Sequence, residues 1–242
     1  MHKWILISSL LSGAALGDYR ASLYSENSVL TRDESVASQT RLRVGKNLPW
    51  NTTPYLQLGQ ELLGSTSTSI VDKGSSFIYL APGIEWNFGM VSLFGEARAR
   101  KFYGDSLQSS SDFRALVVFG DFLQSGIRFL EIYSENLFTS ADGNNFISSS
   151  FLRPGLRWAI KNAFLADIFL EPFLSVDRLG HYYYNRFDLN PSVRLHYAAG
   201  ELDIGLITSY VLNYSFRQTS SEAVDHRFTK GARALFFLSK AL

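Results

Sequence analysis

The chain has 242 residues and a formal net charge of +1, because 23 Lys and Arg nearly balance 22 Asp and Glu. This balance predicts no nucleic-acid partner, since such partners are bound by strongly basic surfaces. The absence of cysteine excludes disulfides, a lipoprotein anchor and thiolate metal sites. The length suffices for one large domain, and no linker or low-complexity run divides it.

Residues 1–17 have the three-part pattern of a secretory signal peptide. His2–Lys3 supplies a positive start, Trp4–Leu11 an apolar core, and Ala15–Gly17 a cleavage site of small residues. The core is too short to span a bilayer as a helix, which needs about 20 residues. We therefore expect export, with a single mature domain at 18–242; the alternative is a buried N-terminal helix.

Twelve segments with alternating apolar and polar residues follow, and most are long enough to cross a membrane as tilted strands. They lie near residues 18–25, 36–46, 52–63, 76–87, 89–102, 112–121, 125–139, 145–160, 163–176, 182–197, 201–215 and 227–241. An even number of strands predicts that both termini lie on the periplasmic side.

The connectors between these segments alternate in length. The long polar loops are Ser25–Glu34, Gly64–Ser76, Tyr103–Asp112, Ser140–Asn145, Asp177–Arg186 and Phe216–Arg227, and the short turns are Asn47–Asn51, Asn87–Met90, Asp121–Gly126, Lys161–Ala163 and Ala198–Glu201. Long extracellular loops and short periplasmic turns are typical of a transmembrane β-barrel. The sequence therefore predicts an all-β fold, an antiparallel barrel of about 12 strands in meander topology.

The alternation also separates charged from apolar faces. A barrel in lipid needs an apolar exterior and tolerates a polar interior, so the charged faces must line the lumen. The predicted lumen-lining charges are Glu96, Arg98, Arg100, Arg153, Arg157, Asp167, Glu171, Arg186, Asp188 and Arg194, with Arg41, Arg43, Glu61, Glu85 and Arg233 as further candidates. Segments 112–121 and 125–139 are less regular, and Leu116 and Val118 either fill the lumen or indicate another register.

Aromatic residues gather at two levels. Those near the short turns, predicted to form a girdle at the periplasmic interface, are Trp50, Trp86, Trp158 and Tyr197, with Phe88 and Phe164. Those near the long loops, predicted at the opposite rim, are Tyr24, Phe102, Tyr103, Tyr182–Tyr184 and Tyr214.

Three strands share a proline-centred frame, Ala81–Trp86, Arg153–Trp158 and Asn190–Leu195, with prolines 72 and then 37 residues apart. These spacings are close to two hairpins and then one, which suggests hairpin repetition. The chain resembles a bacterial outer-membrane β-barrel of about twelve strands, and the proline-glycine strands are similar to barrels of exopolysaccharide-export and phage-adsorption proteins.

This resemblance implies a Gram-negative outer-membrane location, in contact with the lipid bilayer and lipopolysaccharide. The alternating C-terminal residues Ala234, Phe236, Leu238, Lys240 and Leu242 resemble the signal that such barrels present to the outer-membrane assembly machinery, although Lys240 and the final Leu depart from it. Barrels with this architecture include sugar-acid and nucleoside channels, a phospholipase and autotransporter domains.

Four functions fit the pattern, and a porin-like channel for passive diffusion of small hydrophilic solutes is the leading prediction. Rows of Arg opposite rows of acid can orient polar or anionic solutes. The same charges could instead pair with one another and plug the barrel, leaving a structural anchor or a part of polysaccharide export. The polar loops, or the Tyr182–Tyr184 cluster, could serve a surface receptor or adhesin.

Catalysis is not predicted. A barrel lipid hydrolase needs a His beside a Ser, and the only histidines after residue 17 are His181, His196 and His226, none in a recognisable catalytic frame. No cofactor is expected, and no metal is expected because the Asp, Glu and His residues are scattered singly.

Overall fold

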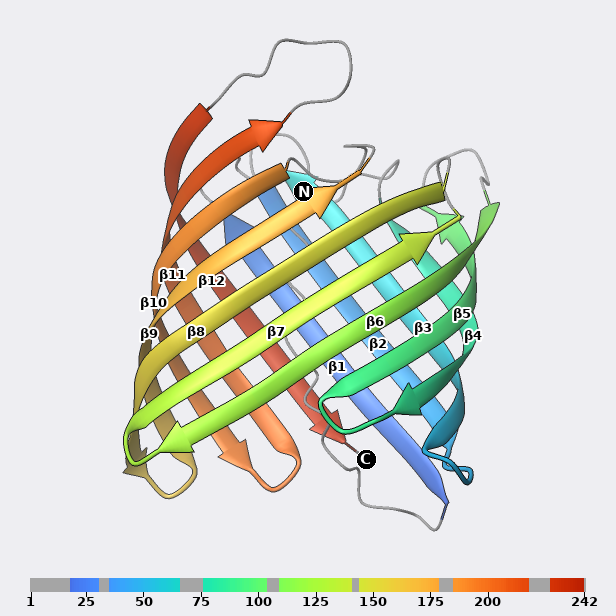
Figure 1. Cartoon of the computed structure of the whole chain (residues 1–242), viewed down its shortest axis with the longest axis horizontal. Coiled ribbons are helices and arrows are strands. Elements are labelled where there is room, and N and C mark those ends of the chain that lie inside the picture. Colours follow the sequence, from blue (N-terminus) through green and yellow to red (C-terminus); the bar gives the residue numbers. More distant parts are fainter. Residues whose placement is uncertain are drawn as a thin grey trace.

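The computed structural model is a closed barrel of twelve antiparallel strands, in which each strand pairs with its sequence neighbours and β12 pairs with β1 (Figure 1).

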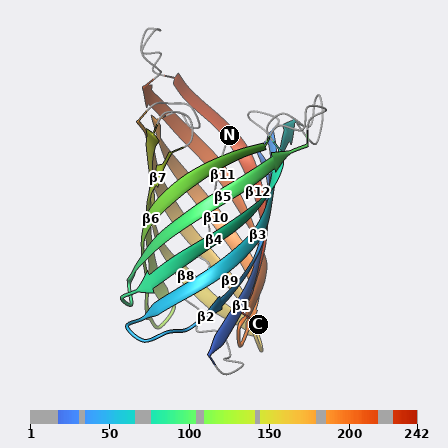
Figure 2. The ribbon, with the colours of Figure 1, turned by 90° about the vertical axis from the view of Figure 1, so that its right-hand side faces the viewer.

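The structure describes residues 18–30, 35–65, 76–103, 109–140, 144–178, 185–217 and 227–241. The strands are β1 (Tyr19–Leu30), β2 (Ser35–Lys46), β3 (Thr52–Ser65), β4 (Phe77–Asn87), β5 (Val91–Phe102), β6 (Ser109–Ser125), β7 (Arg128–Thr139), β8 (Asn145–Lys161), β9 (Phe164–Asp177), β10 (Asn185–Ala199), β11 (Leu202–Arg217) and β12 (Arg227–Ala241). They run obliquely around the wall in both side views (Figures 1 and 2). The predicted all-β fold, strand number and meander topology are confirmed.

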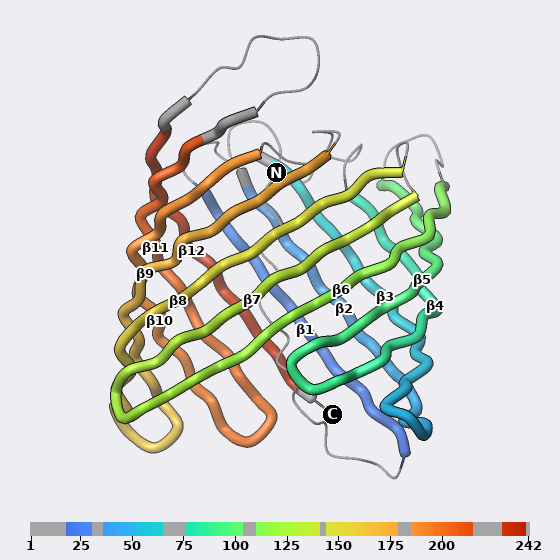
Figure 3. Tube along the Cα trace, in the orientation of Figure 1, coloured from blue at the N-terminus to red at the C-terminus, as the bar shows by residue number. Residues whose placement is uncertain are grey.

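The short connections gather at one end of the barrel (Figure 3). They occupy residues 47–51, 88–90, 126–127, 162–163 and 200–201. The three two-residue turns begin with Gly126, Asn162 and Gly200, whose φ angles of 59°, 51° and 57° suit tight hairpins. Tyr19 pairs with Lys46 and Ser22 with Ala241, so β1 begins and β12 ends at this same short-turn end.

Several sequence predictions fall outside the described residues. These are the signal peptide at 1–17, the cores of the long loops, His181, Tyr182–Tyr184 and His226. In the described ranges, no helix is long and apolar enough to cross a membrane.

The predicted end of the first strand was wrong. β1 continues to Leu30, five residues beyond the predicted boundary, and Tyr24 lies inside the barrel at 3% exposure rather than at the rim. The first three residues of the continuation are polar on both faces: Glu26 and Ser28 point inward, while the outward Asn27 accepts a hydrogen bond from Ser38. A strand without an apolar face gives no hydrophobic alternation, so its sequence looks like a loop.

Alternation of burial along each strand gives the barrel an apolar exterior and a polar interior. In β9, Asp167 and Glu171 are fully buried, while Ile168, Leu170 and Leu174 are 54%, 40% and 44% exposed. A belt of exposed aliphatic and aromatic side chains would be unfavourable in water and is the surface that a hydrocarbon environment requires.

Gly155 on β8 allows a close approach between neighbouring strands. A Cβ at this position would lie 2.6 Å from Cζ of Phe129 and 2.7 Å from the backbone oxygen of Ile168. We expect Gly155→Ala to destabilise the barrel by about 1–3 kcal/mol, because the backbone of β9 cannot yield as a side chain can. Gly95→Ala is the matched control, since its nearest contact is Ile84 Cγ2 at 3.9 Å. Equal urea midpoints for the two variants in lipid would contradict this.

The two halves of the barrel, β1–β6 and β7–β12, carry the same short motifs in the same order. The matching pairs are Tyr24–Asn27 with Tyr133–Asn136, the Leu-Arg-x-Gly motifs Leu42–Gly45 and Leu152–Gly155, Pro82 with Pro191, and Arg114–Leu116 with Arg233–Leu235. The first and third pairs share an interval of 109 residues. The prolines of the three-strand frame lie on β4, β8 and β10, two hairpins and then one apart as their spacing predicted, and the longer motifs add a repeat of six strands.

Equivalent residues of the two halves also make equivalent contacts. At the β6–β7 seam Arg114 pairs with Thr139, and at the closing β12–β1 seam Arg233 pairs with Leu30, the residue equivalent to Thr139. In the lumen Tyr24 donates to Glu26 and Tyr133 to Glu135, while on the outer face Ser38 donates to Asn27 and Ser148 to Asn136. The two halves thus repeat these contacts, and residues at matching positions of the motifs can be compared.

Candidate functional site in the barrel lumen

Charged side chains that point inward from the strands fill much of the lumen. Of the charges predicted there, those buried are Glu96, Arg98, Arg153, Asp167, Glu171, Arg186, Asp188 and Arg194, and those half-buried are Arg100 and Arg157. Among the further candidates, Glu61 and Arg233 are buried and Arg41, Arg43 and Glu85 are half-buried. The structure brings most of them together as ion pairs.

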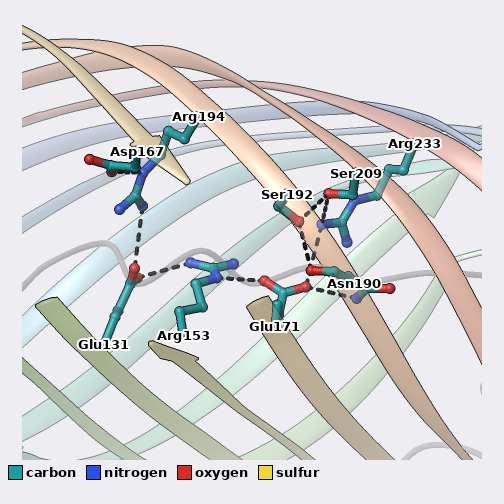
Figure 4. Close-up of polar contacts among 9 residues, drawn as sticks. All are labelled: Glu131, Arg153, Asp167, Glu171, Asn190, Ser192, Arg194, Ser209 and Arg233. Carbon is teal, nitrogen blue, oxygen red and sulfur yellow. Dashed lines mark hydrogen bonds and ion pairs between the residues drawn. The ribbon is translucent and has the colours of Figure 1, made fainter. Parts of the chain in front are cut away.

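An ion-pair network crosses the wall formed by β7 to β12 (Figure 4). Arg153 lies between two carboxylates: its Nη1 donates to Oε1 of Glu131 at 2.9 Å and its Nε to Oε2 of Glu171 at 2.5 Å. Glu131 also accepts from Nη1 of Arg194 at 3.3 Å, and Glu171 contacts Nη2 of Arg233 at 3.4 Å. Arg153 is 2% exposed, and charges so far from water are stable only when each is compensated.

The network continues toward the short-turn end through Asp167. Arg157 binds this carboxylate in a two-pronged contact, Nε to Oδ1 at 2.8 Å and Nη2 to Oδ2 at 2.9 Å. Nε of Arg194 donates to Oδ2 at 2.7 Å. His196 lies 3.4 Å from the same oxygen and 2.8 Å from Oδ1 of Asp203. His196 thus contacts two carboxylates rather than a serine, which is not the arrangement of a catalytic triad.

The opposite wall has a second cluster near the long-loop end. Arg98 binds Asp112 through Nε at 3.1 Å and Nη2 at 3.0 Å, and Arg100 lies 3.7 Å from the same carboxylate. Nη1 of Arg98 is 3.6 Å from Glu61. Two arginines sharing one aspartate therefore occur on both walls, at opposite ends of the lumen.

Arg43 is the counterpart of Arg153, yet it is held more loosely. Its Nε and Nη2 donate to Oε1 of Gln57 at 3.0 and 2.9 Å, and Nη1 is 3.4 Å from Glu85. The guanidinium lies 4.2 Å above the ring of Tyr55. Its side chain is 23% exposed, so Arg43 faces more water than Arg153 does.

A small cavity and a large one lie in the described part of the lumen. The smaller, about 60 Å³, is lined by side chains from β2 to β9, among them Arg41, Arg43, Tyr79 and Phe173. The larger, about 660 Å³, lies at the short-turn end and is lined by residues that include Arg157, Arg194, His196, Asp203, Phe122 and Phe237; we call it the vestibule. Arg153 and Glu171 line neither of these cavities.

Sequence reasoning missed several interior charges that the network uses, chiefly Glu131, Asp112, Arg114 and Glu135. They lie on β6 and β7, where inward-facing apolar residues obscure the alternation. Val118 packs against an interior cluster of Tyr133, Phe151 and Phe173, and Leu116 lines the smaller cavity. The Tyr-Ser-Glu-Asn repeat could have revealed Glu135 as the counterpart of Glu26.

The aromatic residues near the short turns lie as follows. Trp50 is 91% exposed in the β2–β3 turn and Trp158 is 38% exposed on β8, while Trp86 lies one residue before the end of β4. Tyr197 packs against Phe164 with ring centroids 5.0 Å apart. In the described ranges, no group of three or more acidic or His side chains is arranged to hold a metal ion.

The closed sheet, apolar exterior and charged interior together define an outer-membrane-type transmembrane β-barrel with a porin-like architecture. No protein-family model and no curated protein matches the sequence.

Solved structures with a similar fold include a bacterial polysaccharide outer membrane secretin, at TM-score 0.49 and 13% identity over 92% of this chain and 98% of that one. The β domain of the Bordetella autotransporter Brka gives a TM-score of 0.45 at 13% identity, over 92% and 98% of the two chains. The KdgM porin in complex with disordered oligogalacturonate gives 0.43 at 9%, over 90% and 98%. Values this low carry no argument about function.

Proposed function

We propose that this protein is a bacterial outer-membrane channel of narrow bore, which lets small hydrophilic solutes diffuse through a charged lumen. The signal at residues 1–17 directs export and the C-terminal strand engages the assembly machinery. The apolar outer face contacts the bilayer and lipopolysaccharide. No catalytic step, cofactor or metal is part of this function.

One observation supports the proposal above the others: charged side chains extend along the lumen from the long-loop end to an accessible vestibule of about 660 Å³ at the short-turn end. Arg98 and Asp112 lie near the long loops, whereas Arg157 and Asp167 lie near the short turns. Arg side chains present several donors to a passing polar or anionic solute, and paired acids keep the lumen close to neutral.

Conductance of the refolded mature protein, residues 18–242, in a planar lipid bilayer tests the proposal. We expect discrete current steps that scale with salt concentration. A folded barrel without current steps in any salt would contradict a channel and support the plugged alternative. The observation that favours that alternative is the Arg153–Glu171 pair, whose side chains are buried inside the barrel at 2% and 0% exposure.

Arg43 should influence ion selectivity, because it is the most exposed arginine among the described lumen ion pairs. We expect Arg43→Gln to shift the reversal potential in a salt gradient toward cations, since a fixed positive charge is removed from the path. Lys161→Gln, at the β8–β9 turn outside the lumen, is the control. Identical reversal potentials in wild type and Arg43→Gln would show that Arg43 lies off the ion path.

A further inference from the structure

The vestibule at the short-turn end has the size and the lining of a small-molecule site. Its volume of about 660 Å³ lies within the usual range of ligand pockets. Apolar side chains line much of it: Phe122, Phe237, Leu165, Leu202 and Met90. A ligand held here therefore has an apolar part.

Arg157 and Asp203, two groups of opposite sign, face this cavity with bonding capacity left over; Asp121, whose Oδ1 accepts from the backbone N–H of Phe122, also lines it. Arg157 uses Nε and Nη2 on Asp167, and in the described part of the chain its Nη1 makes no hydrogen bond. Asp203 uses Oδ1 on His196, while its Oδ2 makes none with any described residue. The side chain of Asp203 is 36% exposed and that of Arg157 is 15% exposed, so both can meet a ligand.

The positions of these two groups are fixed by buried neighbours. Arg157 is held by the fully buried Asp167, and its guanidinium lies 4.9 Å above the ring of Phe122. Asp203 is held by His196, whose other nitrogen faces Asp167. Preorganised charges of this kind lower the ordering cost of binding a ligand.

Comparison with the other half of the barrel shows that the fold does not require these charges. The counterparts of Arg157 and Asp167 are Asn47 and Thr53, which make one neutral hydrogen bond of 3.2 Å in the same place. Extending the β4–β5 pairing into its turn places the uncharged Met90 opposite Gly89, at the position that corresponds to Asp203. In the first half these positions at the short turns carry neutral residues, so the charges of Arg157, Asp167 and Asp203 point to a role beyond folding.

We infer that the vestibule binds a small zwitterion with an apolar side chain, such as a hydrophobic amino acid. Nη1 of Arg157 donates to its carboxylate, Oδ2 of Asp203 accepts from its ammonium, and the side chain packs among Phe122, Phe237 and Leu165. The inference rests on the proposed function, because that function places the vestibule on the path of the solute. Binding to the vestibule is measured without conductance.

Calorimetric titration of the refolded full barrel with L-phenylalanine tests the inference. We expect saturable binding, with weaker binding of phenylpropionate and of phenethylamine, which each lack one charge. Asp203→Asn should weaken the binding of L-phenylalanine by about tenfold or more, which is the effect of losing one charged hydrogen bond. The affinity for phenylpropionate, which has no ammonium group, should not change. Arg157→Gln should weaken the binding of phenylpropionate and leave the affinity for phenethylamine unchanged.

Glu201→Gln is the matched control, because this carboxylate lies in the β10–β11 turn two residues from Asp203 and does not line the vestibule. Asp203→Asn keeps the test valid if Arg157→Gln fails to fold, since Asp203 is partly exposed. Absence of L-phenylalanine binding to a barrel that conducts ions would overturn the inference and leave the channel intact. An equal loss of affinity for L-phenylalanine, phenylpropionate and phenethylamine in Asp203→Asn would also overturn the inference.

Discussion

Replacing Arg153 with leucine is expected to lower the free energy of unfolding by about 3–5 kcal/mol, the usual result of removing one partner from a buried ion pair. Leucine fills part of the space but leaves Glu131 and Glu171 without their shared cation, and Arg153 is only 2% exposed. Urea unfolding of the refolded barrel in lipid vesicles, followed by tryptophan fluorescence, measures the change.

The repeated Leu-Arg-x-Gly motif supplies a matched control for this substitution. Arg43→Leu removes the counterpart guanidinium, which contacts the neutral Gln57 and the partly exposed Glu85. We expect a loss below about 1 kcal/mol, because water can reach the carboxylate that remains. Similar losses in both variants would show that the Arg153 network contributes no more than an ordinary exposed pair. Adding Glu131→Gln to Arg153→Leu should restore part of the stability, since Arg194 keeps Asp167 as its partner while one undercompensated carboxylate is removed.

The fold was predictable where each strand has one apolar and one polar face. In β9 the two faces separate cleanly, so the sequence alone indicated both the strand and the direction of Asp167 and Glu171. The turns were equally informative, because Asn162 and Gly200 are residues that accept a positive φ. Lipid imposes this separation, since it tolerates polar groups only inside the barrel.

Prediction failed where the lumen itself is apolar or the exterior polar. β6 and β7 bury Val118, Tyr133 and Leu137 inside the barrel, and β1 places Ser25 and Asn27 outside. Neither pattern has a period-2 hydrophobic signal, although the pairing of backbone groups still requires a strand there.

The ion-pair network was less accessible to sequence reasoning than the strands. Alternation tells which residues point inward, but it does not tell which of them meet. Arg194 on β10 pairs with Glu131 on β7, three strands away. This pairing depends on the tilt and the shear of the strands around the closed barrel. The vestibule likewise combines Phe122 from β6, Arg157 from β8 and Asp203 from β11. Such groupings require the closed structure, whereas the half-barrel repeat was already visible as two Tyr-Ser-Glu-Asn sequences.

Placing a charge on the outer face should reveal the depth of the barrel in the membrane. Leu170 lies near the middle of β9, points outward and is 40% exposed. We expect Leu170→Arg to destabilise the barrel by about 2–4 kcal/mol, the cost of an arginine near the bilayer midplane. Urea unfolding in lipid vesicles measures this loss.

Ile160→Arg is the depth control for this measurement. Ile160 is also outward-facing, at 64% exposure, but it lies one residue before the end of β8 at the short turns. The same substitution there should cost about 0–1 kcal/mol, because the arginine reaches the interface. A large loss of stability for Ile160→Arg with none for Leu170→Arg would mean that the hydrocarbon belt lies nearer the short-turn end than the exposed side chains indicate. If neither substitution changes stability in lipid, the outer face is not the lipid-contacting surface, and the membrane placement is wrong.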